Sequence, residues 1–253
     1  MTEPLARRAL AEGLGTGLLV TVVVGSGIMA SRLSPHDLGL QLLENSTATA
    51  LGLAVLIMML GPISGAHFNP VVTLADCALG RRTGTGVDAR TVAVFIPVQT
   101  VGGIGGAVLA NLMFALPAAT ASTHTRTGAH LWLGEVVATA GLVLLVFALA
   151  RTGRGRYGPA AVGAYIGAAY WFTSSTSFAN PAVTIARAFT DTFAGIAPGS
   201  ITGFVVAQLL GAALGAALVL ALFPHRPTPG KPLAATDRTA ELAAAAASAR
   251  SAI

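Results

Sequence analysis

Charged side chains are scarce in this chain of 253 residues. Lys and Arg contribute 15 residues and Asp and Glu contribute 10, so charged residues make up 10% of the sequence, against roughly 25% in a typical soluble domain. Hydrophobic residues make up 54%, and the mean hydropathy is +0.73. A soluble domain needs a polar coat that this composition does not supply. The composition therefore excludes a soluble globular enzyme, and it also excludes a disordered regulator.

Cysteine and lysine are nearly absent as well. The single cysteine, Cys77, excludes an internal disulfide framework and a cysteine-based metal cluster. Fourteen of the 15 basic residues are arginines, and Lys231 is the remaining one. The isoelectric point of about 10.3 is in the range of nucleic-acid-binding proteins. The arginines are scattered, however, and no basic face or recognition motif accompanies them, so we expect no nucleic-acid partner.

Motifs of enzymes are missing too. The sequence contains no nucleophile–base pair at a recognisable spacing, no cluster of metal ligands and no nucleotide-binding loop. We therefore expect no catalysis, no bound metal and no cofactor.

Long stretches of the chain carry no charge at all. Asp, Glu, Lys and Arg are absent from the intervals 45–75, 91–125, 136–150, 157–186 and 192–225. About 20 apolar residues in a helix cross the hydrocarbon core of a bilayer. We therefore predict an all-α membrane protein with six transmembrane helices, near Ala9–Ala30, Leu42–Gly61, Thr91–Leu116, Leu131–Ala150, Ala160–Ser177 and Ile201–Phe223.

The basic residues predict an orientation in the membrane. With the N-terminus in the cytoplasm, 12 of the 15 Lys and Arg residues fall in cytoplasmic segments, and only Arg32, Arg126 and Arg187 fall on the other side. This asymmetry follows the positive-inside rule. We predict a multi-pass protein of the inner or plasma membrane with both termini in the cytoplasm. Residues 224–253, rich in Pro and Ala, are expected to form a disordered cytoplasmic tail.

The chain repeats itself within residues 1–223, which we take as one domain. The segment NPVVTLAD begins at Asn69, and the similar segment NPAVTIAR begins at Asn180, 111 positions later (180 minus 69). Three spans in each half, about 9–116 and 131–223, give the second half the opposite direction in the membrane. This is the inverted-repeat architecture of membrane transport proteins. Two further pairs of polar residues repeat at similar offsets, namely Glu12 with Glu135 and Gln99 with Gln208.

Each repeat also contains a helix too short to cross the membrane. About ten residues, from Pro70 to Gly80 and from Pro181 to about Asp191, span roughly 15 Å at 1.5 Å per residue. Asn favours the N-cap position and Pro favours the first helical position, so each helix begins at its Asn-Pro pair. Two inverted half-helices that start at the midplane place their positive N-terminal ends face to face.

The segments before these helices, Gly61–Phe68 and Thr173–Ala179, must then be non-helical at membrane depth. Such backbone is tolerated only where it is buried in protein or lines an aqueous cavity. A purely structural bundle kinked by proline would explain the Pro residues but neither the repeat nor the half-length helices. A pore explains all three features.

These segments resemble a known family. SGAHFNPVVTLA (Ser64–Ala75) and SFANPAVTIAR (Ser177–Arg187) are similar to the paired Asn-Pro-Ala loops of aquaporins and aquaglyceroporins. AEGLGT around Glu12 and GEVVAT around Glu135 resemble the glutamate-bearing first and fourth helices of that family. The resemblance covers nearly the whole chain before the tail. It implies a homotetramer with one pore per subunit and passive flow of small neutral solutes and water.

The resemblance also assigns roles to residues. It implies pore motifs at Asn69, Pro70, Val71, Asn180, Pro181 and Ala182. It implies pore-lining loops that include Gly65, Ala66, His67, Thr176 and Phe178. By spacing from the motifs, the family's selectivity filter falls on Thr49, Ala168, Ser177 and Val183. The family usually has Arg at the last of these positions and bulky aromatic or His residues beside it, and this chain departs at every position.

A filter without arginine predicts a wide and permissive pore. We expect small uncharged solutes larger than water to pass, and the loop sequence resembles a bacterial branch associated with arsenic resistance. Polyols, metalloid acids and methylated arsenicals are therefore candidate cargo. A water-selective aquaporin stays as an alternative, since Tyr170, Trp171, Phe172 and Phe178 lie nearby and the sequence does not give their direction.

Three charged residues need separate interpretations. Ionisable groups at membrane depth are functional by default, so Glu12 and Glu135 allow a proton-coupled transporter as a hypothesis of a different class. Their symmetric placement favours a structural role in which they hold the pore loops. Arg187 lies four residues after Val183. We expect it to pair with Asp191 or to anchor at the membrane interface, and a role as guard of the outer vestibule is the alternative.

Overall fold

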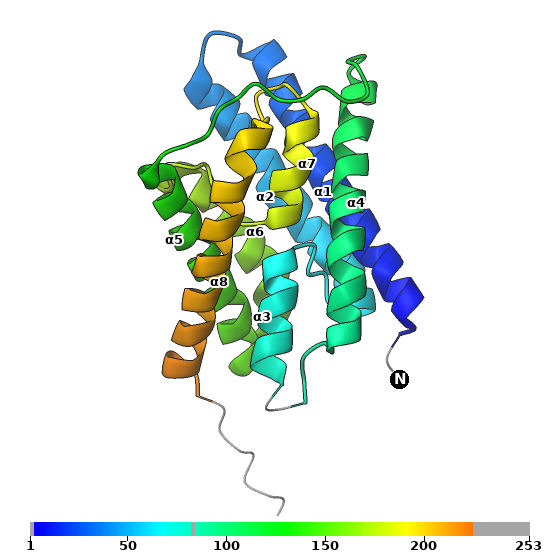
Figure 1. Ribbon diagram of the computed structural model, residues 1–253, viewed down its shortest axis with the longest axis vertical. Coiled ribbons are helices and arrows are strands. Elements are labelled where there is room, and N and C mark those ends of the chain that lie inside the picture. The colour runs from blue at the N-terminus through cyan, green and yellow to red at the C-terminus, as the bar shows by residue number, and fades with distance from the viewer. Residues whose placement is uncertain (1–2, 82–83, 225–253) are drawn as a thin grey trace, which may run out of the picture. The chain divides into compact units, whose positions relative to one another are not determined.

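The computed structural model describes residues 3–81 and 84–224, and every regular element in these ranges is a helix (Figure 1). The predicted all-α architecture is therefore confirmed. Five helices are long and apolar enough to cross a membrane. They are α1 (Leu5–Leu33), α2 (Leu38–Ser64), α4 (Ala89–Met113), α5 (Ala129–Arg151) and α8 (Ile201–Leu222), the last preceded by the 3-10 turn η3 (Pro198–Ser200).

The fifth predicted span, Ala160–Ser177, is shorter than expected. Helix α6 (Gly158–Phe172), which follows the 3-10 turn η1 (Gly155–Tyr157), contains 15 residues and ends five residues before the predicted boundary at Ser177. The chain between Phe172 and Asn180 is uncharged but non-helical. An uncharged loop that directly follows a transmembrane helix has the same composition as the helix. The predicted end at Ser177 was therefore placed too late in the chain.

Local side-chain chemistry sets several helix ends. Asp37 caps α2 by accepting a hydrogen bond from the N–H of Leu40 (2.9 Å), and Asp88 caps α4 through the N–H of Thr91 (2.8 Å). Helix α2 ends at Ser64 because Gly65 adopts a left-handed conformation (φ 93°), which glycine takes without a steric cost. The predicted non-helical link from Gly61 to Phe68 is therefore only Gly65–Phe68, since residues 61–64 still belong to α2.

Two short helices start at the Asn-Pro pairs. Helix α3 runs over Pro70–Gly80, as predicted. Helix α7 covers only Pro181–Ala186 and continues as the 3-10 turn η2 (Arg187–Phe189), so the predicted end near Asp191 was wrong. The carbonyls of Ala188 and Phe189 accept hydrogen bonds from Ser122 and Thr120 instead of continuing a helix. The segment that connects the two halves therefore binds the residues after α7, and these residues do not continue the helix.

The two halves run in opposite directions through the membrane. In Figure 1, α1 begins and α8 ends at the same end of the bundle, α3 points toward that end and α7 points away from it. Helix α1 packs along α4, and its counterpart α5 packs along α8. Between residues 3 and 224, the predicted inverted repeat is thus visible as two matched sets of helices. The predicted tail, apart from Pro224, lies outside the described residues.

Backbone-to-backbone contacts hold these helix pairs close together. An added Cβ on Gly102 would lie 2.1 Å from the carbonyl oxygen of Gly13, and one on Gly106 would lie 2.0 Å from that of Gly17. In the second half, a Cβ on Gly215 would lie 2.6 Å from the carbonyl oxygen of Ala140. Small residues allow such close approach in membranes, where the hydrophobic effect does not drive helices together.

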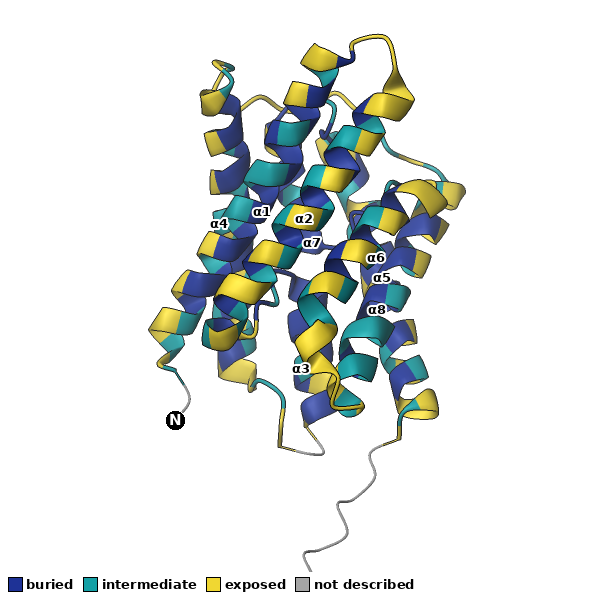
Figure 2. Cartoon of the chain, turned by 180° about the vertical axis from the view of Figure 1, so that it is seen from behind, coloured by how far each residue is buried: buried dark blue, intermediate teal, exposed yellow. Residues whose placement is uncertain are grey.

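The outward faces of the long helices are apolar. Figure 2 shows exposed residues on the outside of each long helix and buried residues inside the bundle. Large apolar side chains such as Leu10, Leu51 and Val101 are 71%, 65% and 69% exposed. Contiguous apolar surface of this kind is unstable in water and suits contact with lipid tails.

Candidate functional site

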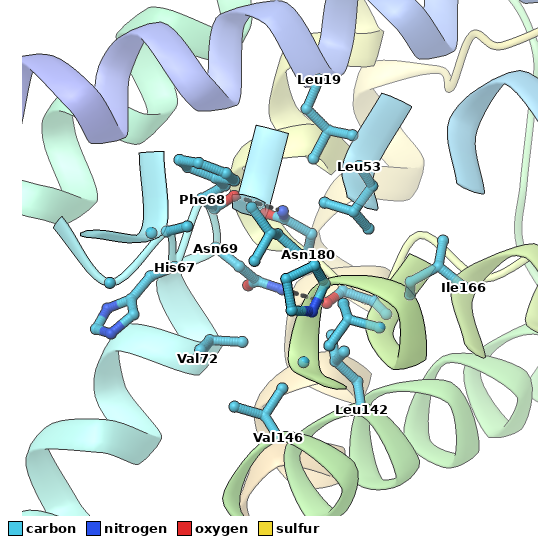
Figure 3. A pocket seen from close by; sticks show the side chains of 18 of the residues that line it. Leu19, Leu53, His67, Phe68, Asn69, Val72, Leu142, Val146, Ile166 and Asn180 are labelled. Carbon is cyan, nitrogen blue, oxygen red and sulfur yellow. Dashed lines mark hydrogen bonds between the residues drawn. The ribbon is translucent and has the colours of Figure 1, made fainter. Parts of the chain in front are cut away.

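A cavity of about 590 Å³ runs past the point where the two short helices begin. Residues of both halves line it, from Arg156 near one end to Thr49 and Arg187 near the other. We call these two ends the α3 end and the α7 end. Figure 3 shows apolar side chains around the two asparagines at the centre of the cavity, among them Leu19, Leu53, Val72, Leu142, Val146 and Ile166.

Asn69 and Asn180 form the polar centre of this apolar cavity. Both adopt an extended backbone (φ −157° in each) at the N-cap position, and both side chains accept a hydrogen bond from their own helix. The Oδ1 atom of Asn69 accepts from the N–H of Val71 (3.1 Å), and that of Asn180 accepts from the N–H of Ala182 (3.0 Å). The side-chain carbonyls are thereby fixed, and the amide NH2 groups point away from the helices.

The two amide groups cross over to the opposite repeat. Nδ2 of Asn69 donates to the carbonyl of Ala179 (2.8 Å), and Nδ2 of Asn180 donates to the carbonyl of Phe68 (2.7 Å), as the dashed lines in Figure 3 show. Each amide has two N–H groups, and one of them is used in this way. The second N–H of each amide remains for whatever occupies the cavity, since both asparagines line it.

The loops before the two helices adopt unusual backbone conformations. Ala66 and Phe68 have φ values of 49° and 47°, and Thr176, Ser177 and Ala179 have values of 61°, 52° and 49°. A left-handed conformation costs a residue other than glycine roughly 1–2 kcal/mol. Such strain persists only where surrounding contacts impose it. The contacts that impose it here come from two buried glutamates.

Glu12 holds the first loop from helix α1. The residue is fully buried, and its carboxylate accepts four hydrogen bonds. The donors are the hydroxyl of Ser64 (2.6 Å), the backbone N–H groups of His67 (2.9 Å) and Phe68 (2.7 Å), and the amide of Gln99 (2.8 Å). Hydrogen bonds to an ionised group are the strong ones in proteins. They offset both the burial of the carboxylate and the strain of the loop.

Glu135 holds the second loop in the same manner. It is fully buried and accepts from the N–H groups of Phe178 (2.9 Å) and Ala179 (2.8 Å) and from the amide of Gln208 (2.6 Å). Gln208 also donates to the hydroxyl of Thr184 (2.9 Å). In the first half, Gln99 donates to the hydroxyl of Thr73 (3.1 Å) in the same way. All bonds to both glutamates are donated by other groups, so the carboxylates act only as acceptors.

The α3 end of the cavity contains both signs of charge. His67, Asp76 and Arg156 line it. The His67 Nε2 atom lies 4.0 Å from Asp76 Oδ2, and its Nδ1 atom lies 3.1 Å from the hydroxyl of Thr73.

The α7 end of the cavity combines hydroxyl groups with one arginine. Thr49, Tyr170, Ser177, Val183 and Arg187 line it. The hydroxyl of Tyr170 donates to that of Thr49 (3.3 Å). The hydroxyl of Ser177 is buried and has no hydrogen-bond partner among the described residues. This end therefore offers polar groups to a molecule inside the cavity.

Arg187 lies inside the protein, so the expected pairing with Asp191 or anchoring at the membrane interface is wrong. Its side chain is 3% exposed and lines the cavity. Nε donates to the carbonyl of Ala194, and the guanidinium carbon lies 3.5 Å from the ring centre of Phe178. Asp191 instead accepts hydrogen bonds from the backbone N–H (2.8 Å) and hydroxyl (3.0 Å) of Thr123.

The connection between the two halves fastens the α7 end. The hydrogen bond from the backbone N–H of Thr123 lowers the pKa of Asp191 below its usual value. Arg126 donates from Nε to the carbonyl of Gly195 (2.9 Å), and burial lowers the pKa of its guanidinium. Both residues tie the segment between α4 and α5 to the segment after α7.

Comparison with known proteins agrees with this architecture. A family model described as Major intrinsic protein matches residues 1–177. The chain belongs to the major intrinsic protein family. It is 52% identical over 224 residues to Aquaglyceroporin AqpS of Rhizobium meliloti (strain 1021). The aligned region covers 88% of this chain and 93% of that protein. It is 30% identical over 234 residues to Aquaporin-2 of Homo sapiens, covering 87% and 80% of the two chains.

A solved structure shows the same fold. The X-ray structure of the aquaglyceroporin from Plasmodium falciparum matches with a TM-score of 0.65 and 18% sequence identity, over 85% of this chain and 96% of that chain. At this identity the likeness shows the fold alone. It supports the aquaporin-like arrangement of membrane helices and two half-helices.

The structure places most, but not all, of the predicted site residues at the cavity of this major intrinsic protein. Of the loop and filter residues, those that line it are Thr49, Gly65, Ala66, His67, Asn69, Phe178, Asn180, Ser177 and Val183. Pro70, Val71, Pro181 and Ala182 are buried within the first turns of α3 and α7 and do not line the cavity. Thr176 does not line it either, although its left-handed backbone belongs to the same loop.

Ala168 was the wrong choice for the filter. It is exposed on the outside of α6 and does not line the cavity. The cavity face of α6 carries Val162, Ile166 and Tyr170, which are spaced four residues apart. Ala168 lies two residues from both Ile166 and Tyr170, so it projects from the opposite face of the helix.

Two residues of the α7 end were expected from the sequence only as alternatives. Tyr170 takes the place that spacing assigned to Ala168, and Arg187 brings an arginine into a cavity that was expected to have none. Helix α6 offered no usable signal for the first, because it is apolar on all sides. The second had a weak signal, namely that Arg187 shares a helix face with Val183.

Proposed function

We propose that this protein is a passive transmembrane channel for small uncharged solutes, such as glycerol-like polyols and uncharged metalloid acids, and for water. The observation that carries the proposal is the apolar cavity with two fixed asparagine amides at its centre. Such a cavity accepts neutral hydroxylated molecules, because they need few hydrogen bonds and no charge compensation. The relative named Aquaglyceroporin AqpS supports the same solute class.

The proposed channel lies in the cell membrane with its N-terminus in the cytoplasm. Among the described arginines, those near the α3 end are Arg7, Arg8, Arg81, Arg90, Arg151, Arg154 and Arg156. Only Arg32, Arg126 and Arg187 lie toward the other end. The positive-inside rule supports a cytoplasmic position for the α3 end. By likeness to the family, four copies form a homotetramer with one pore in each.

The experiment is solute flux into proteoliposomes, measured by light scattering. Water, glycerol and arsenous acid are compared for the wild type, for Val183→Arg and for the matched control Val183→Leu. Val183 lines the cavity and is 5% exposed, so Arg at this position places a large charged side chain in the path. We expect the wild type and Val183→Leu to pass glycerol, and we expect Val183→Arg to lose at least roughly 90% of that flux while it keeps water flux.

Two results would contradict the proposal. Fast water flux with glycerol and arsenous acid excluded from the wild type assigns a water-selective channel, in which Tyr170 closes the α7 end. Solute uptake only in the presence of an ion gradient assigns a coupled transporter that uses Glu12 or Glu135.

A further inference from the structure

Arg187 is a buried cation at the wall of the cavity. It is 3% exposed and lies one helical turn, four residues or about 6 Å, beyond Val183. Two contacts fix its position: the carbonyl of Ala194 and the ring of Phe178 at 3.5 Å. A planar guanidinium stacked on an aromatic ring is held in one orientation. Arg187 is therefore a fixed charge, not a mobile one.

Among the residues that the structure describes, no carboxylate forms an ion pair with Arg187. The acidic residue nearest along the chain, Asp191, is bonded to Thr123, and Glu135 is bonded to Phe178, Ala179 and Gln208. A guanidinium has five N–H donors. Within the described part of the chain, only the Nε donor of Arg187 has a hydrogen-bond acceptor.

The four remaining donors belong to a side chain that lines the cavity. A second buried polar group nearby is also unpaired: the Ser177 hydroxyl, on a side chain 3% exposed, has no partner in the described residues and lines the same cavity. Unpaired buried donors destabilise a protein unless a ligand or water satisfies them. Both groups thus favour an oxygen-bearing molecule inside the α7 end.

We propose that Arg187 is the charge-selective residue of this pore, one turn away from the position where the family usually has its arginine. Its Nη groups donate hydrogen bonds to oxygen atoms of passing solutes, together with the hydroxyl of Ser177. Its charge repels protons and metal cations at the α7 end. This inference rests on the proposed function as a channel. It replaces the expectation of a pore without arginine by a pore whose arginine comes from a different position.

The experiment separates charge from structure. Purified wild type, Arg187→Gln, Arg187→Lys and the double variant Val183→Arg with Arg187→Gln are reconstituted into liposomes. Proton entry under an imposed pH gradient is followed with a trapped pH-sensitive dye, and glycerol and water fluxes are measured in the same vesicles. Arg126→Gln is the matched control, because Arg126 also lies near Phe178 (5.3 Å to the ring centre) but does not line the cavity.

We expect proton entry to rise about tenfold or more in Arg187→Gln while glycerol flux continues, because the variant removes a fixed charge and keeps a hydrogen-bond donor. Arg187→Lys and Arg126→Gln are expected to stay near the wild type. In the double variant, the arginine at position 183 is expected to return proton entry to the wild-type level, with water flux as the measure of correct folding.

Two outcomes would overturn the inference. Wild-type proton entry in an Arg187→Gln protein that still passes glycerol shows that the charge is not selective. Equal proton leaks in Arg187→Gln and Arg126→Gln show a general loosening of the α7 end. Both results leave the proposed channel function standing, because that function fails only if the wild type excludes both glycerol and arsenous acid or takes up solute only under an ion gradient.

Discussion

Replacing Glu12 with Gln tests whether the buried glutamates hold the pore loops. Gln has the same shape, but one carboxylate oxygen becomes an NH2 group. The Glu12 Oε1 atom accepts from Ser64 and His67, and Oε2 accepts from Phe68 and Gln99. Wherever the new NH2 group is placed, it faces one backbone N–H group of the loop. Two donors then face each other in a fully buried site.

The magnitude follows from the number of donors that lose their acceptor. The Ser64 hydroxyl can rotate, and the Gln99 amide can turn its Oε1 atom, which has no partner among the described residues, toward the new NH2 group. The backbone N–H of His67 or Phe68 has no such freedom. One orphaned buried N–H costs about 1–3 kcal/mol. We expect Glu12→Gln to lower the free energy of unfolding by this amount.

The assay is chemical unfolding in detergent, followed by tryptophan fluorescence, together with glycerol flux in proteoliposomes. The control is Glu3→Gln, which removes an exposed ion pair with Arg7 (2.8 Å) and is expected to change stability by less than about 0.5 kcal/mol. Equal stability of Glu12→Gln and wild type would refute the structural role. Loss of a gradient-driven accumulation in Glu12→Gln would instead assign Glu12 to proton coupling.

Two further predictions concern helix packing and pH. Gly106→Val should prevent the close contact of α4 with α1, because its Cβ would lie 2.0 Å from the carbonyl oxygen of Gly17; we expect loss of folded protein on size-exclusion chromatography. Asp191 has a lowered pKa in the folded protein because it accepts hydrogen bonds from Thr123, so its contribution to stability is present above its unfolded pKa and is lost as pH falls through its folded pKa. The free energy of unfolding should therefore fall less between pH 5 and pH 3 in Asp191→Asn than in the wild type. These two pH values lie about one unit to either side of the usual Asp pKa.

Each of these predictions has an internal control. Gly105 neighbours Gly106, and a Cβ there would meet no atom within 4 Å, so Gly105→Val should fold normally. Equal behaviour of the two glycine variants would contradict the packing argument. For the pH prediction, His124→Gln tests the other ionisable group near Asp191 (3.8 Å). If the acid dependence follows His124 and not Asp191, the assignment is wrong.

The sequence predicts the half-helices well because their starts depend on local chemistry. Asn at an N-cap followed by Pro specifies a helix start without help from distant residues, and both helices begin at Pro70 and Pro181 as expected. The symmetric glutamates were also readable, since a charge at membrane depth must find partners. In these cases a few neighbouring residues contain the whole physical argument.

The α7 end could not be read in this way. Helix α6 is apolar on all sides, so its sequence does not mark which face turns inward, and a fixed offset selected Ala168 instead of Tyr170. The position of Arg187 depends on Phe178 and Ala194, which come from loops whose course is set by tertiary hydrogen bonds. A residue count along the chain contains no information about either contact.

The crossed hydrogen bonds of the two asparagines make each half incomplete without the other. When the first half leaves the ribosome, the amide of Asn69 has no acceptor, because Ala179 is still 110 residues away along the chain. Conversely, the carbonyl of Phe68 lacks its hydrogen-bond donor until Asn180 has been made. The eight helices α1 to α8 of the described chain can enter the bilayer one after another, but the two crossed hydrogen bonds form only after the second half has been made. The centre of the cavity is therefore complete only when both halves are inserted in opposite directions.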